Sequence, residues 1–195
     1  SDYKGIKGFQ VQTRTEDPVP FAQAIENNPY AGAWSSGGNL NSDKSMHAMG
    51  GTYTAAFSAG GSNPSVTANH EQYNGTSWTE VADLNLARNQ LAGTGTTPAS
   101  LVFGGSVHPS NKNETEVWNG SAWTEVNNLN TARRLLNGGG TSTATLGFGG
   151  YTTTYVANTE SWDGTSWTEV NDLNTARQGL GAAGISTAAL GFGGA

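Results

Sequence analysis

Apolar residues alternate with polar or small ones in short segments that recur along the chain, each just before a pair of glycines. The clearest alternating pairs are Leu101 and Phe103, Leu146 and Phe148, and Leu190 and Phe192. A spacing of two places both side chains of a pair on the same face of a β-strand. We therefore predict a strand before each glycine pair, and we expect the glycines to allow backbones to approach closely there.

A second pattern follows each glycine pair and predicts a β-hairpin. Its first strand is short and aromatic: Glu71-Gln72-Tyr73, Glu116-Val117-Trp118 and Glu160-Ser161-Trp162. The turn that follows is Asn74-Gly75, Asn119-Gly120 or Asp163-Gly164. Such pairs favour a type I′ turn, in which both central residues have positive φ. The returning strand is expected to begin at a tryptophan and to end near Leu84, Leu129 or Leu173.

These patterns are parts of one repeat. Trp34, Trp78, Trp123 and Trp167 are separated by 44, 45 and 44 residues. The glycine pairs keep the same spacing: Gly60-Gly61, Gly104-Gly105, Gly149-Gly150 and Gly193-Gly194. A basic residue lies ten positions after each tryptophan, and we expect a further strand beyond it: Lys44, Arg88, Arg133 and Arg177. The chain is therefore interpreted as four tandem copies of a unit of about 44 residues.

Each unit predicts a four-stranded antiparallel sheet, which cannot bury its apolar face alone and must stack on its neighbours. Radial stacking of twisted sheets is the solution that β-propellers use. The order Gly-Gly, Glu-x-aromatic, turn, Trp, Leu and Arg resembles the kelch motif over residues 34–194. This resemblance implies an all-β fold, a kelch-type β-propeller with four-stranded blades. The first copy departs from the pattern, because residues 21–33 lack the Glu-x-aromatic-Asn-Gly segment.

The two ends of the repeat region predict a ring with one composite blade. The last copy, residues 177–194, lacks its two outer strands, and the stretch from about residue 21 to residue 40 could supply them. Because an open ring exposes unpaired strand edges, we favour four blades closed within one chain. The alternative is an arc that other subunits or further sequence complete. Residues 21–195 are assigned to the propeller.

Residues 1–20 lie outside the repeat and predict an N-terminal arm. Alternation around Phe9 and Val11 indicates a short strand, and Asp17-Pro18-Val19-Pro20 indicates a stiff extended segment. One interpretation is a frayed tail; the other is a docking arm that adds a strand to a neighbouring subunit, with Ile6, Phe9 and Val11 as its contacts. The opening KGIKGFQVQT and the copies of SWTEVNNLNTAR resemble predicted structural proteins of tailed marine bacteriophages. That resemblance implies a virion location, with the arm bound to the particle.

Composition excludes several other classes of protein. The 195 residues include 9 Lys and Arg against 15 Asp and Glu, a net charge of −6, and show no cationic cluster of the kind that binds nucleic acid. No apolar run approaches the ~20 residues of a membrane span. There is no cysteine, so disulfides, thiolate nucleophiles and Cys-ligated metals are excluded.

Candidate chemical groups are better explained by structure than by catalysis. His47, His70 and His108 have no metal-ligand spacing and are expected at the surface. The glutamates that recur in pairs are expected to form ion pairs and hydrogen bonds with the recurring arginines between blades, rather than acid–base sites: Glu71 and Glu80, Glu116 and Glu125, and Glu160 and Glu169. Trp118, Trp162 and Tyr73 are expected to pack in the core or between blades, with sugar stacking as the alternative.

The sequence therefore predicts a non-enzymatic protein without cofactors or bound metals. The leading hypothesis is a structural virion component (a tail, fibre or surface-decoration subunit) that binds other virion proteins through its arm and belongs to a larger assembly. The second hypothesis is a propeller module that binds host-surface glycans. An intracellular kelch adaptor is a weaker third, because no second domain accompanies the repeats.

Overall fold

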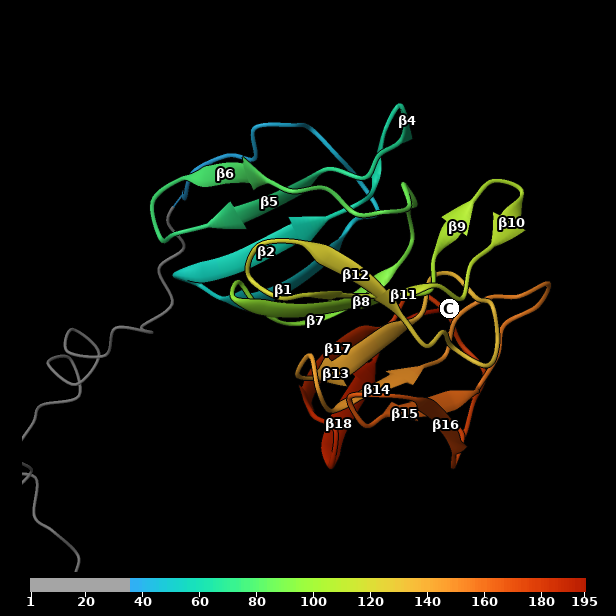
Figure 1. The fold of residues 1–195 in the computed structure, drawn as a ribbon. Coiled ribbons are helices and arrows are strands. Elements are labelled where there is room, and N and C mark those ends of the chain that lie inside the picture. The colour runs from blue at the N-terminus through green and yellow to red at the C-terminus, as the bar shows by residue number, and fades with distance from the viewer. Residues whose placement is uncertain (1–35) are drawn as a thin grey trace, which may run out of the picture. The chain divides into compact units, whose positions relative to one another are not determined.

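The computed structural model describes residues 36–195, and within this range the chain is all-β, without any helix (Figure 1). Residues 37–195 form one unit. The predicted arm with Ile6, Phe9 and Val11, the first anchor Trp34 and most of the stretch proposed to complete the last blade lie outside the described residues.

Three four-stranded antiparallel sheets follow one another along the chain (Figure 1). The first sheet contains β1 (Ala48–Thr52), β2 (Ala55–Ala59), β5 (His70–Tyr73) and β6 (Trp78–Val81). The second contains β7 (Ala92–Thr96), β8 (Ala99–Phe103), β11 (Thr115–Trp118) and β12 (Trp123–Val126). The third contains β13 (Asn137–Gly140), β14 (Thr145–Phe148), β15 (Thr159–Trp162) and β16 (Trp167–Val170). Each sheet has its strands side by side in sequence order, as the repeat predicts.

Three two-stranded hairpins complete the fold. The terminal hairpin pairs β17 (Gly181–Ile185) with β18 (Ala188–Phe192) and corresponds to the first two strands of a fourth sheet. Two smaller hairpins lie within the first two repeats, after their glycine pairs: β3 (Ser62–Asn63) with β4 (Ser65–Val66), and β9 (Ser106–Val107) with β10 (Ser110–Asn111). These smaller hairpins were not predicted from the sequence.

The Asn-Gly turns differ from the prediction. Gly75, Gly120 and Gly164 have positive φ, but the residue before each of them does not, so the turns are not type I′. Tyr73 pairs with Trp78, which leaves a loop of residues 74–77. Asn74 Oδ1 accepts hydrogen bonds from the backbone N–H groups of Thr76 and Ser77 at 2.9 Å. This side-chain cap stabilises the loop with only the glycine left-handed, and it recurs at Asn119 and Asp163.

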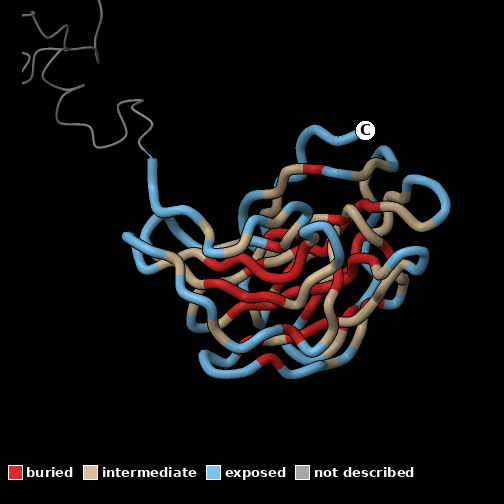
Figure 2. Tube along the Cα trace, turned by 90° about the horizontal axis from the view of Figure 1, so that it is seen from above, coloured by how far each residue is buried: buried red, intermediate tan, exposed pale blue. Residues whose placement is uncertain are grey.

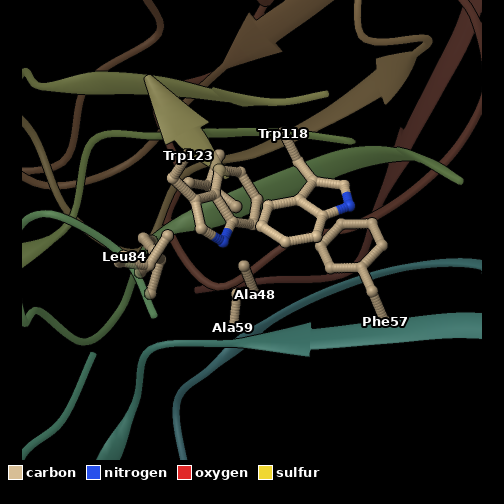
Figure 3. Close-up of a cluster of buried hydrophobic side chains, with 8 residues drawn as sticks. Ala48, Phe57, Ala59, Leu84, Trp118 and Trp123 are labelled. Carbon is tan, nitrogen blue, oxygen red and sulfur yellow. The ribbon is translucent and has the colours of Figure 1, made fainter. Parts of the chain in front are cut away.

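The core lies between successive sheets, while the outer loops are exposed (Figure 2). Between the first and second sheets, Phe57 and Ala59 of β2 face Trp118 and Trp123 of β11 and β12 (Figure 3). Between the second and third sheets, Phe103 packs against Trp167, with 4.8 Å between the ring centroids. Each interface therefore joins the second strand of one sheet to the tryptophan strand of the next.

Successive repeats are also joined by a chain of backbone hydrogen bonds. Met46, Gln90, Leu135 and Gly179 each lie two residues after the recurring basic residue and have φ between +55° and +65°. Gln90 donates its N–H to Met46 O (2.7 Å), Leu135 to Gln90 O (2.9 Å), and Gly179 to Leu135 O (2.8 Å). The first strands of all four copies, β1, β7, β13 and β17, line one cavity of about 430 Å³. The same backbone hydrogen bond thus joins equivalent residues of each copy and the next.

The glycine pairs occupy the close approaches that the sequence predicted. Both glycines of every pair have positive φ, between +64° and +114°. A Cβ on Gly104 would lie 2.8 Å from the carbonyl oxygen of Arg133, and Gly105 donates its N–H to that same oxygen at 2.9 Å. Larger residues are therefore excluded from these corners by backbone conformation and by space.

Candidate functional site

The most elaborate polar site of the molecule is a buried ion pair that occurs once in each of the three complete sheets. Glu71, Glu116 and Glu160 have side chains at most 1% exposed, and each pairs with the basic residue that precedes the sheet: Lys44 (3.4 Å), Arg88 and Arg133 (3.3 Å) respectively. The prediction that recurring glutamates pair with recurring arginines is confirmed for Glu116 with Arg88 and for Glu160 with Arg133. Within residues 36–195 the other predicted partners form no ion pair: Glu80, Glu125, Glu169 and Arg177. A buried charge pair is stable only when further hydrogen bonds satisfy its remaining polar atoms.

The basic residue also links two neighbouring sheets. The carbonyl oxygen of Arg88 accepts the N–H of Gly61, which lies just after β2 of the first sheet. The guanidinium of Arg88 reaches the second sheet, where it binds Glu116 and donates from Nε to Gly104 O at 2.9 Å. One residue therefore fixes the connector to both sheets, which explains why the basic residue and the glycine pair recur together.

An asparagine that was not predicted from the sequence completes each site. Asn85 donates to Glu116 Oε2 from its backbone N–H (2.7 Å) and from Nδ2 (2.9 Å), and its Nδ2 also donates to Trp123 O (3.0 Å). Asn41 and Asn130 make the same three contacts with Glu71 and Glu160 and their sheets. The signal was available, because an asparagine directly follows the recurring leucine in every copy.

The donors around Glu71 control its ionisation. Burial alone would raise the pKa of the Glu71 carboxyl, but hydrogen bonds from Asn41 and the charge of Lys44 outweigh burial and lower its pKa. The carboxylate is therefore held ionised as part of the scaffold. The second glutamate of each pair lies opposite the first in register and is exposed: Glu80, Glu125 and Glu169.

The fourth copy of the site lacks its carboxylate within residues 36–195. Arg177 corresponds to Arg88 and Arg133, but within the described residues its guanidinium bonds only to Gly193 O, at 3.0 Å. The apolar residues beside it are exposed: Leu190 is 62% and Phe192 52% exposed, whereas Leu101 and Phe103 at the same positions of the second sheet are fully buried. The terminal hairpin therefore presents a complete apolar pattern without the strands that cover it in other copies.

At the other end of the repeats, the first sheet has an apolar socket. This socket has a volume of about 600 Å³, and its wall includes Met49, Ser58 and Trp78. In the third sheet the corresponding residues are Gly138, Gly147 and Trp167, and these three surround the ring of Phe103. The residue that corresponds to Phe103 in the fourth copy is Phe192. Within residues 36–195, an open apolar socket and an exposed aromatic side chain thus lie at the two ends of the repeat region.

The histidines differ in their environments. His108 is exposed and His47 is partly buried, with Nδ1 2.8 Å from Ser58 Oγ. His70 is fully buried, so the prediction of a surface position was wrong for this residue. It replaces Thr115 and Thr159 of the other copies, and its Nδ1 accepts a hydrogen bond from Trp123 Nε1 (3.0 Å) in the apolar interface between two sheets. Burial lowers the pKa of His70 to about 4.

The aromatic candidates belong to the packing of the sheets. Trp118 and Trp162 are 2% and 1% exposed, in agreement with the prediction that they pack in the core. Trp162 donates from Nε1 to Ser142 O at 3.1 Å. Tyr73 is partly buried and lies 5.2 Å from Trp78 between ring centroids. The two tryptophans present no open face to a sugar.

Residues 36–195 contain no group of three or more His, Asp or Glu side chains placed to hold a metal ion. In the same range, no helix has the length and apolar character needed to cross a membrane. A comparison with protein-family models found no match, and a comparison with curated proteins found no significant similarity. The kelch and bacteriophage resemblances therefore remain predictions from the sequence.

Proposed function

We propose that the chain forms a closed four-bladed propeller of the kelch type. The three sheets and the terminal hairpin are its blades, and the cavity lined by β1, β7, β13 and β17 is its central channel. Two observations support this: the backbone links that repeat from Met46 to Gly179, and the match between Phe192 and the socket beside Trp78. In the closed ring Phe192 packs against Trp78 at this socket, but less deeply than Phe103 packs in its counterpart, because Met49 and Ser58 replace the two glycines that contact Phe103.

The same proposal assigns the missing strands of the last blade to the segment from about residue 21 to residue 40. Strands added there would complete the sheet beside Leu190 and Phe192 and pair with the outer edge of β18, which within the described part of the chain pairs only with β17. An unpaired edge beside exposed apolar side chains favours association with another strand. Closure within one chain satisfies that edge without a second molecule.

We further propose that the protein is a structural component of a bacteriophage virion, with the arm at residues 1–20 bound to the particle and the propeller facing outward. The observation that carries this proposal is the use of the recurring charged residues. Glu71, Glu116 and Glu160 are all buried and bound by scaffold residues. The recurring glutamates thus stabilise the fold. A rigid fold of this kind suits a surface protein of a particle better than an enzyme.

Fractionation of particles tests this proposal. Particles of the phage that encodes the chain are separated from soluble lysate on a density gradient, and the chain is quantified in each fraction. We expect the chain in the particle fraction, and we expect a variant with Ile6, Phe9 and Val11 changed to Asp in the soluble fraction. Wild-type chain in the soluble fraction alone would reject the virion proposal.

A second candidate function is glycan binding. It is favoured by one observation outside the structural core, a pair of tyrosines in edge-to-face contact in the third repeat. Tyr151 and Tyr155 have ring centroids 6.1 Å apart, and Tyr155 is 46% exposed. Aromatic faces are common contacts for ring-shaped ligands.

A further inference from the structure

The third repeat departs from the others at the loop after its glycine pair. In the first copy, residues Ser62 and Val66 face each other across this loop, and in the second copy Ser106 and Asn111 do so. In the third copy the facing residues are Tyr151 and Tyr155, which form an isolated β-bridge. Repeated side chains build the scaffold, so a position that breaks the repeat is the place to seek a function of this particular protein.

A third side chain extends this pair into a row. Arg134 bridges Tyr151 through the backbone, and Tyr151 in turn bridges Tyr155. Directly opposite residues of antiparallel segments place their side chains on the same face. The guanidinium of Arg134 accordingly lies over the ring of Tyr151, 4.6 Å from its centroid. We name this row of Arg134, Tyr151 and Tyr155 the aromatic row.

The aromatic row is held in place by Asn111 from the preceding repeat. Asn111 Oδ1 accepts a hydrogen bond from Arg134 Nη1 at 2.9 Å, and its Nδ2 donates to Thr152 O at 2.7 Å and Tyr151 O at 3.3 Å. These contacts fix the guanidinium and the loop before any ligand arrives. A preorganised site loses less conformational freedom on binding than a flexible one.

The exposure and charge of the row remain available to a partner. Closure of the ring would cover Leu190 and Phe192, but the row lies in a different repeat, and Tyr155 stays outside that interface. Arg134 forms no ion pair within residues 36–195, unlike Arg88 and Arg133. The row therefore combines an open aromatic face with a cation whose charge no neighbouring carboxylate in that range neutralises.

We propose that the aromatic row binds a pyranose ring that carries a carboxylate, as in a uronic-acid polysaccharide; this inference rests on the second candidate function. The C–H face of the sugar stacks on Tyr155, because its weakly positive hydrogens meet the negative face of the ring. The carboxylate binds the N–H groups of Arg134 that are not bonded to Asn111, since the planar guanidinium matches the geometry of a carboxylate. The exposed hydroxyls of Thr153 and Thr154 flank the row and suit the hydroxyls of the sugar.

Binding of alginate oligosaccharides, which consist of uronic acids, tests the site in the purified full-length chain, with neutral dextran oligosaccharides as comparison. We expect alginate to bind more tightly than dextran, and Tyr155→Ala to weaken alginate binding roughly tenfold, the equivalent of about 1.4 kcal/mol. Arg134→Gln should reduce alginate affinity to that of dextran. The matched control is Tyr53→Ala, since Tyr53 is 83% exposed but lies outside the row.

The outcomes separate the site from the function on which it rests. Tyr155 is exposed, so its replacement should leave the thermal unfolding midpoint unchanged, and this is measured on the same samples. Alginate binding that survives Tyr155→Ala would retain the glycan-binding function and reject the aromatic row as its site. Binding of dextran but not alginate by the wild-type chain would reject the aromatic row as a uronate site and leave glycan binding standing, whereas binding of neither would count against both. None of these results bears on the particle fractionation.

Discussion

The second sheet and the terminal hairpin are built from the same sequence pattern, but they differ in what covers it. Leu101 and Phe103 of the second sheet are fully buried, because β11 and β12 complete that sheet and the third sheet covers its face. Leu190 and Phe192 of the terminal hairpin are more than half exposed. The burial of a residue in this repeat is thus determined by its neighbours, and the terminal hairpin lacks them within the described chain.

The largest expected effect concerns the two phenylalanines. Phe103→Ala should lower the free energy of unfolding by about 4 kcal/mol, because it empties a packed site between Gly147 and Trp167. Phe192→Ala should lower it by about 2 kcal/mol if the socket holds this ring. Chemical denaturation of the full-length chain measures both. A change below about 0.5 kcal/mol for Phe192→Ala is the value for an exposed side chain and would contradict closure.

The buried ion pair provides the next effect. Glu116→Gln removes the charge that Arg88 meets in the second sheet and should cost about 3 kcal/mol of unfolding free energy, because the guanidinium remains buried without a counter-charge. Glu125→Gln is the matched control, since Glu125 lies opposite Glu116 in register but is exposed. Equal and small losses for both variants in urea denaturation would show that the pair does not stabilise the fold.

The interface between the first and second sheets contains His70, whereas the interface between the second and third sheets has Thr115 at the same position. The two should therefore differ in how their stability depends on pH. His70 has a folded-state pKa of about 4 against 6.5 when exposed, so protons bind the unfolded chain first as the pH falls. Neutral His70 therefore contributes about 3 kcal/mol to the free energy of unfolding above pH 6.5, and this contribution is lost progressively as the pH falls toward 4. His70→Thr should remove this loss, because Thr115 already accepts the Trp167 indole N–H at 3.0 Å in the next interface. Identical pH profiles for wild type and variant would refute the assignment.

The smallest effect concerns two glycines with the same backbone conformation. Gly104 and Gly193 have φ of +65° and +69°, but a Cβ on Gly104 would meet Arg133 O at 2.8 Å, whereas one on Gly193 would meet nothing within 4 Å. Gly104→Ala should cost about 2 kcal/mol. In a closed ring the carbonyl oxygen of Lys44 would lie beside Gly193. Gly193→Ala should then lower the free energy of unfolding as much as Gly104→Ala does. A cost for Gly193→Ala that is about half as large, from backbone strain alone, would favour an open arc.

Much of the fold could be predicted from the sequence, because the same pattern of residues occurs four times along the chain. The strands that begin at Trp78, Trp123 and Trp167 and the partnership of glutamate with arginine followed from spacing alone. The prediction of type I′ turns was wrong because it considered backbone preferences and overlooked the capping oxygen of Asn74. The preference of Asn-Gly for a turn type describes the backbone alone. It does not predict that the asparagine side chain will accept the hydrogen bonds of the loop.

The candidate sites were harder to predict, because they depend on contacts between distant segments. Asn85 contacts Glu116 across 31 residues. The recurrence of the asparagine after each leucine marks it as important, but only the structure shows which carboxylate it binds. His70 looked like any surface histidine until Trp118 and Trp123 of the next repeat were placed around it. Tyr151 and Tyr155 could not be found by a search for recurring residues, because they occur in the third repeat alone.

The central claim is that the repeats surround one axis and that Phe192 closes the ring. Nuclear Overhauser contacts in the full-length chain test it directly, because the Phe103–Trp167 ring pair serves as an internal standard in the same spectrum. We predict cross-peaks between the ring protons of Phe192 and the indole of Trp78, comparable to those between Phe103 and Trp167. Cross-peaks for the standard pair alone, with none from Phe192 to Trp78, would contradict a closed ring.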